Sequence, residues 1–142
     1  DSVAYRPEDD GSSGTSTPYG VVFETNLNLS TVDAEISSNV VGATRAAVYR
    51  MSDTTLLGET DISNLSGGDI CSVSLSTATT SSESYSFIIG AEGANYTAGA
   101  YSAPSLPYES ADGTVSMTGA TFDDTRTYSN DIRNIRGVGD IV

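Results

Sequence analysis

Carboxylates are the only side chains in this sequence that are numerous enough to offer acid–base chemistry. Nineteen residues are acidic, six are arginine, and histidine and lysine are absent. Without histidine there is no Ser-His-Asp or Cys-His pair and no imidazole metal ligand, and without lysine there is no Schiff base. A glycosidase-like carboxylate pair remains, but so many acids bring some pair together by density alone. The sequence therefore predicts a protein that is not an enzyme.

Aspartates in turn-like segments are the candidate metal ligands. Asp123 and Asp124 are adjacent, as are Asp9 and Asp10, and Asp69 follows two glycines. Their hard oxygen atoms suit Ca²⁺ or Mg²⁺, although none of them has the spacing of an EF-hand. We therefore expect no cofactor, with a structural Ca²⁺ bound by Asp123 and Asp124 as the alternative.

Tyrosines gather in the Pro/Gly-rich stretch that follows the strongest predicted strand. Tyr96, Tyr101 and Tyr108 lie there, with Asn95 and Glu92 nearby. A tyrosine ring can stack on the apolar face of a sugar while amide and carboxylate groups hydrogen-bond its hydroxyls. These five residues are the candidate contacts with a glycan or another partner. The alternative is that the tyrosines simply pack at strand edges.

Three Asn-x-Ser/Thr sequons begin at Asn28, Asn64 and Asn95. Such sequons accept N-linked glycans in exported proteins. A chain this rich in serine and threonine would contain about two of them by chance. The sequons therefore favour an exterior location only weakly.

Short β-strands are the elements that must position these groups. In Ser84–Ala91 the residues Tyr85, Phe87 and Ile89 recur at period two, which predicts a half-buried central strand. In a second strand, Thr44–Met51, Arg45 and Tyr49 share one face, together with Ala47 and Met51. Further strands are predicted at 21–23, 32–36, 56–60, 70–75, 115–122 and 130–136, with 100–108 as an edge strand or an ordered loop.

An all-β fold follows from these segments. No amphipathic helical pattern of ten residues occurs, and roughly eight to ten short strands alternate with turns, which is typical of an antiparallel, jelly-roll-like β-sandwich. Residues 1–20 are polar and contain Pro7 and Pro18, so we expect an irregular N-terminal arm or linker before a single sandwich domain at 21–142. Cys71 is the only cysteine, which excludes an internal disulfide and favours a place in the core.

The formal net charge of −13 limits the partners and the medium. It argues against nucleic acid and anionic membrane surfaces, and no run approaches 18 consecutive apolar residues. Self-repulsion at this charge destabilises a compact state, but in molar salt the screening length falls to about 3 Å. A strongly acidic, lysine-free composition is therefore typical of a protein adapted to high salt. The alternative is an ordinary acidic secreted domain.

The run from Gly90 to Gly113 resembles part of a known family. Its two pieces read Gly-Ala-Glu-Gly-Ala-Asn-Tyr-Thr-Ala-Gly at 90–99 and Pro-Ser-Leu-Pro-Tyr-Glu-Ser-Ala-Asp-Gly at 104–113. With a closing segment at 130–135, this resembles a β-sandwich module of structural proteins of haloarchaeal tailed viruses. The likeness extends over about residues 20–136. It implies a component of tail fibres, baseplates or capsid surfaces, and it supplies no catalytic residues.

We therefore expect a non-enzymatic structural protein on the surface of a halophilic archaeal virus particle, in a tail fibre, a baseplate or a capsid decoration. Its expected partners are other virion proteins, further copies of itself and host surface glycans, with no nucleic acid and no membrane. The expected location is the virion surface or the extracellular space. Two alternatives stay open. One is a secreted haloarchaeal carbohydrate-binding module, and the other is a subunit of a cell-surface filament assembled through its N-terminal arm.

Overall fold

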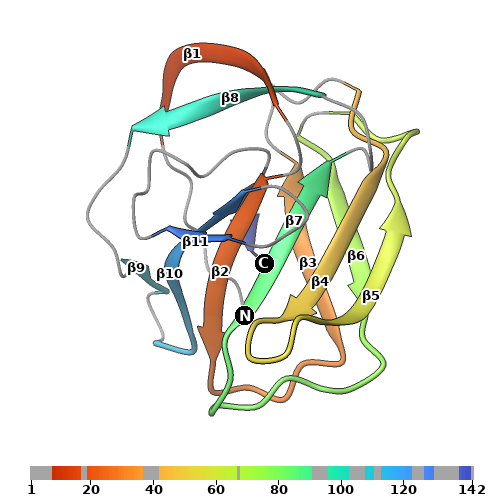
Figure 1. Ribbon diagram of the computed structural model, residues 1–142, viewed down its shortest axis with the longest axis vertical. Helices are drawn as coiled ribbons and strands as arrows, with labels where there is room; N and C mark the ends of the chain where they lie inside the picture. Colours follow the sequence, from red (N-terminus) through yellow and green to blue (C-terminus); the bar gives the residue numbers. More distant parts are fainter. Residues whose placement is uncertain are drawn as a thin grey trace.

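The computed structural model is an all-β protein made of antiparallel sheets (Figure 1). The structure describes residues 8–16, 19–36, 42–66, 68–90, 96–102, 108–110, 113–122, 127–129 and 138–141. This arrangement confirms the predicted all-β, sandwich-like fold. The finer designation as a jelly roll stays a prediction.

The strands follow one another along the chain as β1 (Glu8–Ser16), β2 (Tyr19–Thr25), β3 (Thr31–Ile36), β4 (Arg45–Arg50), β5 (Thr55–Asp61), β6 (Ile70–Ser74), β7 (Tyr85–Gly90), β8 (Tyr96–Ser102), β9 (Tyr108–Glu109), β10 (Val115–Phe122), β11 (Thr127–Ser129) and β12 (Val138–Ile141).

The large sheet has the strand order β11-β10-β2-β7-β4-β5, and β9 also pairs with β10. Strand β7 lies between β2 and β4, so that Phe87 is opposite Val21 on one side and Val48 on the other. The predicted central strand is therefore confirmed. Every residue of β7 is buried, however, rather than those of one face alone. The outer face carries a second apolar cluster in which Ile88 of β7 joins Ala47 and Tyr49 of β4.

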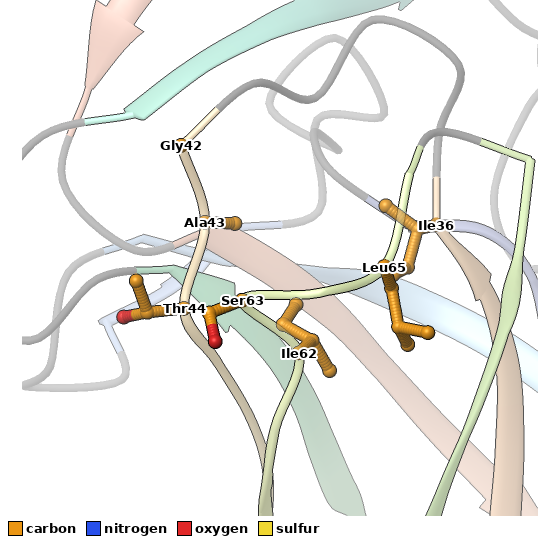
Figure 2. Close-up of a pocket in the computed structure, with 7 residues that line it drawn as sticks. All are labelled: Ile36, Gly42, Ala43, Thr44, Ile62, Ser63 and Leu65. Carbon is orange, nitrogen blue, oxygen red and sulfur yellow. The ribbon is translucent and has the colours of Figure 1, made fainter.

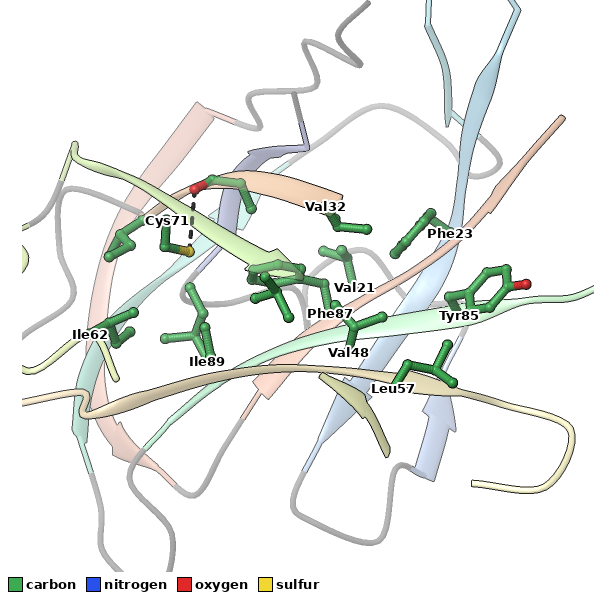
Figure 3. Close-up of a cluster of buried hydrophobic side chains, with 14 of the residues drawn as sticks. Val21, Phe23, Val32, Val48, Leu57, Ile62, Cys71, Tyr85, Phe87 and Ile89 are labelled. Atoms are coloured by element: carbon green, nitrogen blue, oxygen red, sulfur yellow. Dashed lines mark hydrogen bonds between the residues drawn. The ribbon is translucent and has the colours of Figure 1, made fainter. Parts of the chain in front are cut away.

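The small sheet has the order β12-β3-β6, and its inner face packs on the large sheet. Alternate residues of both sheets point into one core, as period-two patterns require (Figure 3). Cys71 lies in this core as predicted, and its thiol donates to the Ala34 carbonyl oxygen at 3.5 Å. Among the residues with described burial, the largest fully buried side chains are Tyr85, Phe23, Phe87, Ile36, Ile62, Ile89, Met117 and Val21.

A β-bulge in β5 connects the two sheets at one edge of the sandwich. The β4–β5 register shifts after Val48, which faces Gly58, whereas Tyr49 faces Leu56. Leu57 is the extra residue, and it is buried while its neighbour Leu56 is exposed. The Leu57 carbonyl oxygen accepts a hydrogen bond of 2.8 Å from the Ser76 amide. This bond joins the edge of the large sheet to the segment that leaves β6.

The N-terminal part of the chain differs from the sequence-based expectation. Residues 1–20 were expected to be irregular, but Glu8–Ser16 forms β1, which pairs antiparallel with β8 in a separate two-stranded sheet. We call this pair the β1–β8 ribbon; it lies at the top of Figure 1. Strand β1 has no apolar residues at period two, so its sequence gives no strand signal. Its backbone is held in the extended form by pairing with β8. Strand β2 also begins earlier than predicted, at Tyr19.

The later strands fit the predictions unevenly. An edge strand or an ordered loop is expected at 100–108, whereas β8 begins earlier, at Tyr96, and ends at Ser102. The strand expected at 115–122 is β10. Strands β11 and β12 were not predicted, and the strand expected at 130–136 lies outside the described residues.

Candidate functional site

The end of the β4–β5 pair carries a polar hollow of about 480 Å³. Its lining residues are Thr44, Arg45, Glu59, Thr60 and Asp61, and we refer to it as the Arg45 hollow. Antiparallel pairing explains why they meet, since Arg45 faces Asp61 and Ala47 faces Glu59. The volume falls within the range typical of sites for small ligands.

Arg45 is held in place by two neighbours on the outer face of the large sheet. Its Nε donates to Glu59 Oε2 at 2.6 Å, and its Nη2 donates to the Tyr49 hydroxyl at 2.8 Å. The guanidinium carbon lies 5.8 Å from the centroid of the Tyr49 ring, within cation–π range. Partial burial lowers the pKa of Arg45, but the hydrogen bonds to Tyr49 and Glu59 outweigh this effect and raise it. The guanidinium is therefore a fixed positive charge.

The carboxylates of the hollow are suited to accepting hydrogen bonds. The Ser63 amide donates to Asp61 Oδ1 at 2.8 Å, and the hydrogen bonds from Ser63 lower the pKa of Asp61. A general acid needs a raised pKa. Asp61 therefore suits recognition of hydroxyl groups rather than proton donation. The Glu59 side chain is 52% exposed, so an incoming group can reach it.

A smaller hollow of about 110 Å³ lies beside it, at the same end of the sandwich (Figure 2). Ile36, Ile62 and Leu65 supply an apolar side, and Thr44 and Ser63 supply hydroxyl groups. Backbone hydrogen bonds frame it, with the Ile62 amide donating to the Thr44 carbonyl oxygen at 3.0 Å. This space is well below the usual size of a cofactor site.

The three tyrosines among the predicted glycan-contact residues lie on two strands of different sheets. Tyr96 and Tyr101 lie on β8 in the β1–β8 ribbon, opposite Ser16 and Asp9. Tyr108 lies on β9, opposite Met117 in the large sheet. The two other candidates, Asn95 and Glu92, lie outside the described residues.

The predicted metal ligands are mostly beyond what the structure describes. Asp123 and Asp124 lie outside the described residues. Asp69 is described, and its Oδ2 accepts a hydrogen bond of 2.8 Å from the Ser66 amide, which fastens the loop before β6. No group of three acidic or cysteine side chains that could bind a metal occurs in the described part of the chain.

Ser110 and Gly113, at the end of the run from Gly90 to Gly113, form part of a hairpin turn. The Ser110 Oγ accepts hydrogen bonds from the Thr114 and Val115 amides at 3.1 and 3.2 Å. The Ser110 amide donates back to the Val115 carbonyl oxygen at 2.9 Å. Gly113 has a φ of 71°, which favours glycine. These two residues of the run therefore connect β9 to β10.

Sequence reasoning did not find the Arg45 hollow. The shared face of Arg45 and Tyr49 was visible in the strand pattern, and an arginine next to an aromatic residue is a usable signal. The other partner of Arg45 is Glu59 on β5, and its position beside Arg45 depends on the register in which β5 pairs with β4. A one-residue change of register moves every side chain of a strand to the other face.

Comparison with protein-family models and with curated proteins gave no match for this chain. Among the described residues, no helix is long and apolar enough to cross a membrane.

Proposed function

We propose that this chain is a non-enzymatic structural module on the surface of a halophilic archaeal virus particle, in a tail fibre, a baseplate or a capsid decoration. The observation that carries this proposal is the charge. The chain has nineteen acids against six arginines. Both arginines with described side chains are bound to carboxylates, Arg45 to Glu59 and Arg50 to Asp53. Such a surface suits a medium of high salt, which screens the acidic excess.

The form of the fold supports a structural role. The two sheets share one core, and the bulge at Leu57 joins the edge of β5 to the segment after β6. Edges that are bulged or short resist unwanted pairing between copies. The resemblance of residues 90–113 to virion modules supports the place in a virus particle, and assembly with other virion proteins and further copies of this chain is part of the proposal.

Protein analysis of purified particles tests this function. The chain should be recovered from virions of a halophilic archaeal virus at a constant number of copies per particle. Antibodies against it should label intact particles in electron micrographs. Intact virions that lack the chain would overturn the proposal.

The Arg45 hollow favours a second candidate, a carbohydrate-binding module. Its guanidinium, carboxylate and threonine hydroxyl groups can hydrogen-bond a sugar such as one on a host surface. Glycan-array binding at molar NaCl should then be lost in Arg45→Ala and kept in Arg50→Ala, which removes an arginine from the same strand. Loss in Tyr96→Ala or Tyr101→Ala alone would instead locate the contact on β8. Absence of binding to any glycan would contradict this second function.

A further inference from the structure

Two of the three sequons share the same pattern of exposure; one follows β2 and the other follows β5. In Asn28-Leu29-Ser30 and in Asn64-Leu65-Ser66, the asparagine and the serine are exposed while the leucine is half-buried. Leu29 and Leu65 both pack against the main core. Each leucine therefore anchors its sequon, and the asparagine and serine flank it on the solvent side.

Hydrogen bonds fix the backbone around Asn28. The Leu29 amide donates to Thr79 Oγ1 at 2.8 Å, and the Thr79 amide donates to the Leu29 carbonyl oxygen at 3.0 Å. The Ser30 carbonyl oxygen accepts from the Leu75 amide at 2.9 Å. Asn28 projects from this fixed segment, and its side-chain amide makes no hydrogen bond within the described part of the chain.

Asn64 projects from a tight turn. The Leu65 amide donates to the Ile62 carbonyl oxygen at 3.0 Å, so Ser63 and Asn64 are the two central residues of a β-turn. The Ser66 amide is bound to Asp69 Oδ2 at 2.8 Å. The Asn64 side-chain amide likewise has no hydrogen-bond partner among the described residues. A group attached to either asparagine nitrogen would extend into solvent without moving the core.

We propose that Asn28 and Asn64 are N-glycosylation sites. The carboxamide nitrogen would attack the anomeric carbon of a lipid-linked glycosyl phosphate supplied by the exporting cell. An N–C bond forms, the C–O bond to the phosphate breaks, the nitrogen loses one proton, and the lipid phosphate leaves with the bonding electrons. The inference rests on the proposed surface location, because sequons are glycosylated in exported proteins.

The chain contains a matched control for this proposal. Asn26 precedes Leu27, as Asn28 precedes Leu29, and it is also exposed. Its second following residue is Asn28 rather than serine or threonine, so it does not begin a sequon. Asn26→Gln therefore changes an exposed asparagine in the same loop without removing an acceptor.

Peptide mass spectrometry of the chain recovered from particles and from the medium of a halophilic archaeal host tests the inference. Peptides that contain Asn28 or Asn64 should carry hexose-type mass additions. Asn28→Gln and Ser30→Ala should abolish the first addition, Asn64→Gln and Ser66→Ala the second, and Asn26→Gln neither. The thermal midpoints of all five variants should stay close to that of the parent chain.

The outcomes separate this inference from the proposed function. Unmodified Asn28 and Asn64 in chain recovered from particles would overturn glycosylation and leave the virion role intact. Modified chain found in the cell envelope but missing from particles would support glycosylation and overturn the virion role. Unmodified chain confined to the cell interior would overturn both.

Discussion

Cys71 shows how the core constrains the chemistry of a single residue. The thiol is 3% exposed and lies among the apolar residues of both sheets. Burial raises the pKa of Cys71 from 9.0 to about 11, because the thiolate would lose its hydration. The thiol therefore stays protonated in the folded chain at pH values where the unfolded chain has begun to ionise.

This difference predicts a loss of stability at high pH. Between about pH 9 and pH 11 the folded state binds more protons than the unfolded state, so the free energy of unfolding falls as the pH rises. A shift of this size corresponds to about 2–3 kcal/mol. Chemical denaturation of the parent chain and of Cys71→Ala across this range measures it. The difference between the two proteins should change with pH, and parallel curves would contradict the prediction.

The two described arginines of β4 should contribute unequally to stability. The Arg45 side chain is 18% exposed and binds both Glu59 and Tyr49, whereas Arg50 is more exposed and pairs with Asp53 in the following turn. Arg45→Ala should therefore cost about 1–2 kcal/mol, and Arg50→Ala should cost less. Urea titrations of both variants test this order. Equal losses would mean that the Tyr49 contact adds nothing.

At Gly58, strand β5 lies close to the end of β6. A Cβ atom placed on Gly58 would lie 2.0 Å from the Ser74 carbonyl oxygen, and a backbone atom cannot easily move aside. Gly58→Ala should destabilise the fold by about 1–3 kcal/mol, since overpacking forces the two strands apart.

An exposed residue on the same strand provides the control for Gly58. Leu56 is 40% exposed, so Leu56→Ala should change stability by about 0.5 kcal/mol or less. Thermal and urea denaturation of both variants make the comparison. If Gly58→Ala were as stable as the parent chain, the close contact between β5 and β6 would not hold in solution.

The sequence predicted the elements that depend on side-chain periodicity and not those that depend on pairing. Strand β7 was found because Tyr85, Phe87 and Ile89 alternate with other residues. Strand β1 was not, because its acidic, glycine, serine and threonine residues have no apolar face and only the register with a partner defines it. The segment expected at 100–108 overlaps only the end of β8. The same limit applies to the Arg45 hollow, which needs the bulge-dependent pairing of β4 and β5.

At the scale of the whole molecule, charge should control stability. The net charge is −13, and the described arginine side chains are already bound to carboxylates. Because screening weakens the repulsion between the remaining acids, the melting temperature should rise steeply between about 0.1 M and molar NaCl. Differential scanning calorimetry over this range measures the rise. A flat melting temperature would argue against adaptation to high salt.

The β1–β8 ribbon has a mechanical consequence. Among the described strands, β1 pairs only with β8, and neither of the two belongs to a sheet of the sandwich. A pulling force applied ahead of Glu8 would reach the hydrogen bonds of this ribbon before it reached the core. Releasing the nine residues of β1 would free about 30 Å of extended chain. Under such a force the ribbon would therefore separate first and the chain would lengthen, while the sandwich stays folded.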